Sequence, residues 1–249
     1  MKIIRFIFLL AALLFIFNAC SQEEAAQPNS LTKAEIKAGW TLLLDGQTLE
    51  GWRGIHRDDV PACWGVVDGE LVVNPPGVET EDIGDIITAD KYADFELKWE
   101  WKMGEPGGNS GLKYYVVEDY SIGHGGIGLE YQILDDVNHE AVKSGQIKNN
   151  DYHTLAALYE LYEAQENKPV NPLGEWNSSR VVSQNNHVEH WLNGTMVLQY
   201  TRGDDDFRKR VAISKFKKYE NFGLAKEGPI VLQEHGGAIS FRNIKIKTL

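Results

Sequence analysis

An alternating run at residues 95–102 constrains the fold of this chain more than any other feature. It reads Phe-Glu-Leu-Lys-Trp-Glu-Trp-Lys, so every apolar residue is followed by a charged one. Side chains two positions apart on a strand share a face, and this period is typical of an antiparallel strand with one buried and one solvated face. The alternation therefore predicts that Trp99 and Trp101 lie in the core.

Turn residues extend this pattern to hairpins. Asp68-Gly69 and Asn193-Gly194 each separate two strand-like stretches, and both pairs favour the type I′ turn that joins antiparallel strands. A change of parity between Phe241 and Ile244 predicts a bulge near Arg242-Asn243. Further strands are expected at residues 40–45, 85–88, 110–117, 128–134, 153–160, 179–185, 197–201, 229–234 and 238–247.

Helical patterns are scarce. Residues 32–38 predict one short turn after a Thr cap, and residues 204–216 predict one amphipathic helix with acids at its start and Lys at its end. Many regularly spaced strands with one or two short helices indicate an all-β fold, a two-sheet antiparallel sandwich of jelly-roll type. Residues 38–249 are long enough to form one such domain.

The N-terminus predicts export. Its basic start and the apolar run at residues 6–17 have the pattern of a secretory signal, and the run is shorter than the ~20 residues of a membrane span. Ala19-Cys20 resembles a lipoprotein cleavage site. Residues 1–19 are then a signal peptide, and Cys20 carries a lipid; a plain secretory cut is the alternative, because Phe17 replaces the usual Leu.

Residues 20–37 are polar and contain Pro, which predicts a flexible tether. We therefore expect a protein anchored by lipid in the cell envelope, in the periplasm or at the outer-membrane surface. Membrane contact is expected through the lipid only. With Cys20 acylated, Cys63 is the one remaining cysteine, so no intramolecular disulfide can form.

The charge balance argues against a nucleic-acid partner. Without residues 1–19 the chain keeps 23 Lys and Arg against 36 Asp and Glu, a net charge of about −13. A polyanion would be repelled, and no stripe of basic and aromatic residues is present.

Glu130 and Gln132 stand in a strand-like tract, Gly128 to Asp136. Because side chains alternate, they project together while Tyr131 and Ile133 project to the other face. One face can pack a core and the other can present a carboxylate and a carboxamide to a small polar ligand. A solvated sheet face is the simpler interpretation for a single Glu.

Other tracts also combine ionisable groups with aromatics, an arrangement that suits a sugar, because rings stack on its C–H face and polar groups bind its hydroxyls. An oligosaccharide or glycoside is the expected substrate. The candidate residues in these tracts are Lys113, Glu175, Arg180, His190, Lys215, Gln233, His235 and Arg242.

The alternatives for these residues stay open. His190 follows the apolar parity of its strand, so it is either a core histidine or a site residue. Lys215 could simply complement the helix dipole. Arg180 and Arg242 could clamp a carboxylate or a developing enolate, or form surface ion pairs.

An ordinary glycosidase needs two carboxyl groups, about 5–5.5 Å apart for retention or about 6.5–9.5 Å for inversion. Glu130 and Asp135 have the outer spacing of the E-x-D-x-x-E signature of glucanases, but Gln132 replaces its central acid. Gln cannot hold the charge that tunes the neighbouring carboxylates. A conventional retaining glucanase is therefore disfavoured, and the spacing can equally be coincidental.

Seven sequence segments occur in order along the chain and together resemble one family. They are Trp40 to Gly46 with Gly51-Trp52, Ser110 to Tyr114, Gly128 to Asp136, Gly174 to Asn177, Val188 to Gly194, Ser214 to Phe216, and Leu232 to Gly236 followed by Phe241 to Ile246. They are similar to those of the 3-keto-disaccharide hydrolase family, over nearly all of the chain from Trp40 onward. Glu234 stands where the family usually has Asp, which is a mild departure. Residues 138–151 do not follow the family's sequence pattern.

The resemblance implies that residues 38–249 form one sugar-active domain, a concanavalin A-like jelly roll. It also implies a secreted enzyme that cleaves sugars oxidised at C3. A 3-keto group acidifies the C2 proton, so that a base can remove it and the C1 leaving group can depart by elimination. Proton transfer is then expected from Glu130 with His190 or His235, and Glu175 is a further catalytic candidate. Lys113, Gln132, Arg180, Gln233, Lys215 and Arg242 are expected to bind the sugar.

The ketone and an adjacent hydroxyl could also hold a divalent metal cation, with Glu130, Asp135 and His235 as candidate ligands. The anomer, the leaving group and the metal are left open by the sequence. A non-catalytic carbohydrate-binding lipoprotein on the same sandwich and a conventional glucanase remain the alternative functions.

Overall fold

The computed structural model describes residues 27–119 and 126–249. Its larger sheet has eight strands in the order β11-β10-β9-β6-β13-β4-β3, with β1 also paired to β13. The smaller sheet has five in the order β2-β5-β12-β7-β8. All of these pairings are antiparallel, which confirms the predicted two-sheet sandwich.

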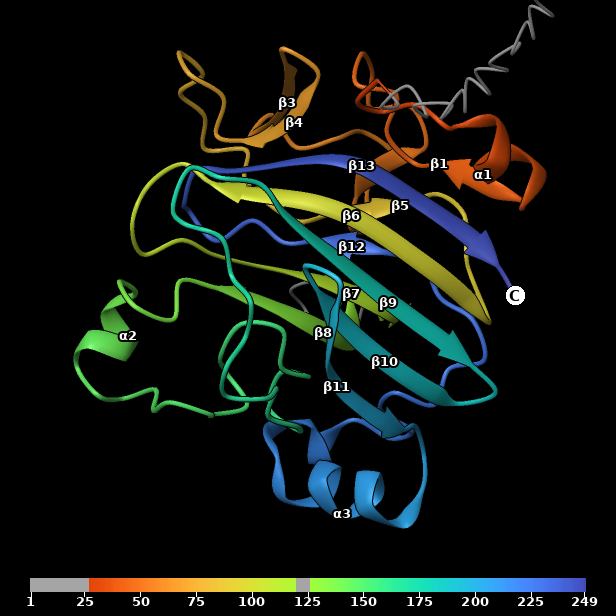
Figure 1. Cartoon of the computed structure of the whole chain (residues 1–249), viewed down its shortest axis with the longest axis vertical. Helices are drawn as coiled ribbons and strands as arrows, with labels where there is room; N and C mark the ends of the chain where they lie inside the picture. Colours follow the sequence, from red (N-terminus) through yellow and green to blue (C-terminus); the bar gives the residue numbers. More distant parts are fainter. Residues whose placement is uncertain (1–26, 120–125) are drawn as a thin grey trace, which may run out of the picture.

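The larger sheet comprises β1 (Trp40–Leu42), β3 (Trp64–Val67), β4 (Glu70–Val73), β6 (Phe95–Met103), β9 (Asn177–Gln184), β10 (His187–Leu192), β11 (Thr195–Thr201) and β13 (Ile239–Thr248). The smaller sheet comprises β2 (Trp52–Gly54), β5 (Ile86–Thr88), β7 (Asn109–Val117), β8 (Ile127–Leu134) and β12 (Val231–Leu232). Short helices are α1 (Lys33–Lys37), α2 (Glu140–Lys143), α3 (Asp205–Ile213) and the 3₁₀ helix η2 (Lys215–Lys218). In Figure 1 α1 and α3 lie toward opposite ends of the molecule.

The core lies between the inner faces of the two sheets. Along β6 the burial alternates residue by residue, as the sequence predicted, and Trp99 and Trp101 are each 1% exposed. The indole N–H of Trp101 donates to Ser179 Oγ at 2.9 Å, which satisfies its buried polar group. From the smaller sheet, Tyr131 meets the Trp99 ring edge-on at 4.9 Å.

Both predicted hairpin turns are confirmed. The φ angles are 51° and 83° at Asp68 and Gly69, and 45° and 80° at Asn193 and Gly194. Positive φ at both central residues is what a type I′ turn requires. The predicted bulge is also confirmed, because the β13–β6 register shifts between Arg242 and Lys245.

Two predictions of secondary structure need correction. Residues 153–160 form no strand; they run irregularly along the edge of β8, because Ala156 and Glu160 have φ of 63° and 68°. The helix expected at 204–216 ends at Ile213, where extended Ser214 starts η2.

The tether expected at residues 20–37 is folded in its last part. Asn29 exchanges hydrogen bonds of 2.7 Å with Asn243, and Lys245 pairs with Glu35 on α1 at 2.6 Å. The predicted signal peptide, residues 1–19, and the lipidation site Cys20 lie outside the described residues. Within residues 27–119 and 126–249, no helix is long and apolar enough to cross a membrane.

Candidate active site

A cavity of about 310 Å³ opens on the outer face of the smaller sheet and gathers six of the predicted site residues. They are Lys113, Glu130, Gln132, Lys215, Gln233 and His235. Strands β7 and β8 and the segment just after β12 supply the floor, and η2 supplies Lys215.

Strand register explains why the polar groups of the floor meet. Lys113 on β7 stands directly opposite Glu130 on β8, and Gly111 stands opposite Gln132. Gln233 continues β12, and its N–H donates to the Gly111 carbonyl at 3.0 Å. Directly opposite residues have Cβ atoms about 4.5–5.5 Å apart, so the register alone brings the acid, the amides and the cation together.

Glu130 is buried rather than solvated, with only 8% of the residue exposed. Burial raises the pKa of its carboxyl group, while the nearby cations Lys113 and Lys215 act in the opposite direction. A carboxylate with a raised pKa is a stronger base than one in water, and the two cations favour its ionised form. The solvated-face interpretation is therefore wrong for Glu130.

Two buried carboxamides flank this carboxylate. The Gln233 side-chain amide donates to Glu130 Oε2 at 3.4 Å, and that of Gln132 donates to the His153 carbonyl at 3.3 Å. The carboxamide oxygens of Gln132 and Gln233 have no hydrogen-bond partner within the described part of the chain. Buried acceptors are normally paired, so these two suit a ligand that carries hydroxyl donors.

Gly111 makes room for this arrangement. A Cβ at this position would lie 2.1 Å from Gln233 Oε1 and 2.9 Å from Glu130 Oε1. Both distances are too short for a carbon contact, so only glycine lets the two side chains lie over β7 as they do.

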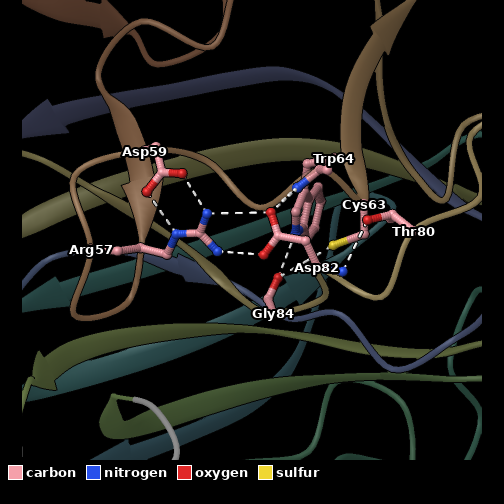
Figure 2. Close-up of polar contacts among 8 residues, drawn as sticks. Arg57, Asp59, Cys63, Trp64, Thr80, Asp82 and Gly84 are labelled. Atoms are coloured by element: carbon pink, nitrogen blue, oxygen red, sulfur yellow. Dashed lines mark hydrogen bonds and ion pairs between the residues drawn. The ribbon is translucent and has the colours of Figure 1, made fainter.

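Lys113 is held from the side of β5. Its Nζ lies 3.6 Å from Asp85 Oδ2, and Asp85 also accepts the Glu234 N–H at 3.0 Å. Two sets of hydrogen bonds fix the loop that precedes Asp85 (Figure 2). The Arg57 guanidinium bridges Asp59 and Asp82. The Trp64 indole N–H donates to the Gly84 carbonyl at 2.7 Å.

Lys215 reaches the cavity from η2. Its Nζ lies 4.1 Å from the centre of the Tyr159 ring and 3.7 Å from Glu160 Oε1. Glu160 also contacts His153 Nε2 at 3.1 Å. The Tyr159 N–H donates to the Glu130 carbonyl at 3.1 Å, so the irregular segment beside β8 ties Lys215 to the floor.

His235 stands exposed at the rim. The protein packed beneath the ring lowers the pKa of its imidazole by desolvation, and Lys113 and Lys215 act in the same direction, against Asp85. The ring is therefore favoured in its neutral form, which can accept a proton.

His190 does not belong to this site. It is fully buried between the sheets, where its Nε2 contacts the Tyr114 hydroxyl at 2.7 Å and its Nδ1 the Ala156 carbonyl at 2.9 Å. Burial lowers its pKa to about 4. The expectation that His190 transfers a proton is therefore withdrawn in favour of the core interpretation.

Arg180 and Arg242 lie on the outer face of the larger sheet, on the other side of the core. Arg180 stacks 4.0 Å from the Trp191 ring and bonds Glu96 at 3.1 Å. Arg242 stacks 4.1 Å from the Trp176 ring and bonds Glu100 at 2.6 Å. Both are surface ion pairs, so the prediction that they bind the reacting sugar is not supported.

Glu175 and Asp135 line a different cavity, of about 290 Å³, which shares no lining residue with the Glu130 cavity. The Asp135 carboxylate accepts hydrogen bonds from the N–H groups of Gly107, Val137 and Asn138, which fix the loop after β8. Glu175 is exposed. Neither is placed to act on a ligand that contacts Glu130.

The predicted metal trio is consequently not assembled, because Asp135 is separated from Glu130 and His235. No group of three or more His, Cys, Asp and Glu side chains within residues 27–119 and 126–249 is arranged to hold a metal ion. The donor set present does not fit a metal held by three such side chains.

Sequence reasoning missed Asp85, Tyr159 and Glu160. Asp85 follows a Gly at the start of a short strand, a position that gave no functional signal. Tyr159 and Glu160 stand in a segment whose sequence pattern predicts a regular strand. Their contact with the site depends on positive φ angles that the sequence pattern does not reveal.

Comparison with known proteins identifies the family. The model of the 3-keto-alpha-glucoside-1,2-lyase-like domain matches residues 39–247. The chain belongs to this family. A 3-keto-disaccharide hydrolase of Bacteroides thetaiotaomicron is 33% identical over 249 aligned positions, which cover 91% of this chain and 84% of that protein.

Solved structures agree with this membership in the 3-keto-alpha-glucoside-1,2-lyase-like family. A protein of Parabacteroides distasonis, described as a candidate glycosyl hydrolase, is 36% identical with a TM-score of 0.78, over 90% of this chain and 100% of that one. A second such protein of the same organism is 30% identical with a TM-score of 0.60, over 84% and 99%. These relatives and the jelly-roll sandwich support a carbohydrate-active enzyme of the glycosidase type.

Proposed function

We propose that the Glu130 cavity is the active site of an enzyme that cleaves the glycosidic bond of 3-keto-glycosides, including 3-keto-disaccharides. One observation carries the proposal. Glu130 is the single carboxylate among the described residues that line the cavity, and it stands among the cations Lys113, Lys215 and Lys218. Ordinary glycoside hydrolysis needs a second carboxyl group across the scissile bond, whereas elimination from a ketone needs one base and positive charge.

The reaction begins at C2 of the oxidised sugar. Glu130 removes the C2 proton, and the electrons of the C2–H bond move toward the C3 carbonyl to form an enolate. Lys113, which faces Glu130 across the β7–β8 pair, supplies positive charge to the enolate oxygen, with Lys215 from η2. The free carboxamide oxygens of Gln132 and Gln233 accept hydrogen bonds from sugar hydroxyls and fix the ring over Glu130.

The leaving group then departs. The enolate re-forms the ketone, the C1–O bond breaks, and a double bond forms between C1 and C2. The leaving oxygen takes the proton that Glu130 removed from C2, which the neutral imidazole of His235 at the rim can accept and pass on, so that Glu130 returns to its carboxylate form. Addition of water, with hydroxide to C1 and a proton to C2, completes a net hydrolysis. Release of the unsaturated sugar before that addition is the lyase outcome.

The test compares two substrates of the purified protein. 4-Nitrophenyl glucosides, α and β, are incubated beside their 3-keto counterparts, with and without chelator. We expect nitrophenol from a 3-keto compound only. Release from neither compound would leave a sugar-binding protein, and release from only the unoxidised glucoside would indicate a conventional glucanase. The chelator arm tests the divalent cation that the sequence predicted.

We also propose that the protein is anchored in the cell envelope by a lipid on Cys20. The sequence of residues 1–20 supports this anchor. The net negative charge of the chain and the absence of a disulfide at Cys63 are compatible with it. Labelling of cells with a fatty-acid analogue should mark the wild-type protein and not the Cys20→Ser variant. Equal labelling of both would overturn the anchor.

A further inference from the structure

A second cavity, of about 510 Å³, adjoins the Glu130 cavity. The two share three wall residues, Ile127 from β8 with Lys218 and Tyr219 from η2 and its C-cap. Sites for small ligands usually measure about 300–1,000 Å³. The first cavity, of about 310 Å³, is at the lower end of this range, so the pair offers room for a ligand longer than one sugar ring.

The wall between the cavities is pre-formed. Phe216 of η2 stacks on Phe222 with ring centres 4.0 Å apart and an interplanar angle of 8°, and the Ser214 side chain caps η2 by accepting the Phe216 N–H. Tyr219 lies between these two phenylalanines in sequence. A ligand that packs on the Tyr219 ring would therefore bind with little entropic cost, because the wall is already ordered before the ligand arrives.

The far side of the second cavity is a strained bulge. The register of β7 with β8 shifts between Tyr114 and Val117, and Tyr115 has a φ of 52°, which is rare for a bulky residue. Gly228 crosses this bulge so closely that a Cβ would lie 2.5 Å from the Val116 nitrogen. Bulges and strained residues of this kind gather beside functional sites, and this one lines the second cavity through Tyr115.

The chemistry of the second cavity suits holding a sugar rather than reacting with it. Glu130, Gln132 and Gln233 line the first cavity only. The second offers the half-buried Tyr219 ring, the Asn221 amide and the Lys218 ammonium, beside the carboxylates of Asp119 and Glu220. An aromatic face with a few polar groups is what binds a pyranose without changing it.

We propose that this second cavity is the leaving-group subsite, which holds the second sugar ring of a 3-keto-disaccharide while the oxidised ring lies over Glu130. The inference rests on the proposed function. Tyr219 is then a specificity-determining residue that packs against the C–H face of the leaving sugar, and Lys218 and Asn221 bind its hydroxyls. The scissile bond lies at the shared wall.

The test compares a 3-keto-disaccharide with methyl 3-keto-glucoside of the same anomeric linkage, whose leaving group cannot fill the second cavity. Wild type should have a higher kcat/KM for the disaccharide. Tyr219→Ala should lower kcat/KM for the disaccharide about tenfold and that for the methyl glycoside less, because Tyr219 also borders the Glu130 cavity. Asn221→Gly, which removes the side chain while tolerating the φ of 57°, should act in the same direction.

Lys217→Ala is the matched control, because Lys217 is exposed on the same helix and lines neither of the two cavities. It should leave both substrates unchanged. Thermal unfolding of each variant shows that it is folded, and Tyr219→Phe, which keeps the ring, should retain most of the disaccharide preference. Equal losses on both substrates in Tyr219→Ala would overturn the subsite.

Calorimetry separates this inference from the proposed function. Glucose, maltose, cellobiose, trehalose and sucrose are titrated into wild type, Tyr219→Ala and Lys217→Ala. A disaccharide that binds more tightly than glucose, and loses that advantage only in Tyr219→Ala, supports the subsite even if no ketone is cleaved. Cleavage of methyl 3-keto-glucoside with no disaccharide advantage in binding or kinetics overturns the subsite and leaves the proposed function standing.

Discussion

Gly111→Ala should inactivate the enzyme while leaving it folded. The new Cβ would lie 2.1 Å from Gln233 Oε1 and 2.9 Å from Glu130 Oε1, and real Cβ atoms essentially never approach closer than 3.0 Å. Carbon contacts relax toward ~3.5 Å, so the Gln233 carboxamide must move by about 1 Å or more. The hydrogen bond from Gln233 to Glu130, already 3.4 Å long, is then lost.

The expected magnitudes separate function from stability. An extra methyl group in a packed site costs ~1–3 kcal/mol, and replacing a glycine at an ordinary φ returns ~0.4–1 kcal/mol through the unfolded chain. The net loss of about 1–2 kcal/mol lowers the Tm of a domain of this size by roughly 2–8 °C. A misplacement of about 1 Å at the reacting groups costs ~10²-fold in rate, so kcat/KM should fall much further than stability.

The assay measures kcat/KM on a 3-keto-glycoside together with thermal unfolding. Gly104→Ala is the control, because its Cβ would come no closer than 3.4 Å to any neighbour. Gln233→Ala removes the atom that clashes, so the double variant should lose less activity than the two single losses combined. Wild-type kcat/KM in Gly111→Ala would refute the argument that glycine makes room for Gln233 and Glu130.

Three further predictions follow from burial and placement. Glu130→Gln should lower kcat by ~10²–10⁴-fold. Because burial raises the pKa of the Glu130 carboxyl, the stability that this group contributes at low pH is lost as the pH rises through its folded pKa. In urea unfolding, the stability of the variant relative to wild type should therefore increase from about pH 4.5 to neutral, and a pH-independent difference would contradict the burial argument. His190 has the opposite sign: its pKa falls from 6.5 to about 4, so its stabilisation is present above 6.5 and lost as the pH falls toward 4. That shift corresponds to a loss of up to about 3 kcal/mol in the free energy of unfolding. The free energy of unfolding of His190→Gln should lack this loss at low pH. Arg180→Ala should leave kcat/KM unchanged, since Arg180 lies across the core from Glu130; a loss as large as that of Lys113→Ala would return Arg180 to the site.

Period-two patterns predicted the sheets and which residues share a face, because alternation follows directly from strand geometry. Glu130 and Gln132 were therefore paired correctly from sequence. The same patterns could not say which outer face of the sandwich a residue occupies. Arg180 stands on a strand of the larger sheet and Lys113 on a strand of the smaller one, so two equally polar candidates point away from each other.

Contacts made across the core or by irregular backbone were also beyond the sequence. His190 has the parity of a core residue, but its partner, the Tyr114 hydroxyl, comes from the other sheet. Glu160 reaches Lys215 only because its backbone adopts a φ of 68° in a segment that sequence patterns assign to a strand. The sequence did not reveal the role of Gly111, because that role is the space that it leaves for Gln233.

The central claim is that Glu130 cleaves a glycosidic bond by first removing a proton from C2 of a 3-keto sugar. The most direct measurement runs the reaction in D₂O and determines the deuterium at C2 of the released sugar by mass spectrometry and NMR, with product incubated alone as the control for exchange. The account predicts one deuterium at C2 for each hydrolytic turnover by wild type, and neither turnover nor exchange above the control with Glu130→Gln. Released sugar that keeps its original C2 hydrogen would contradict it.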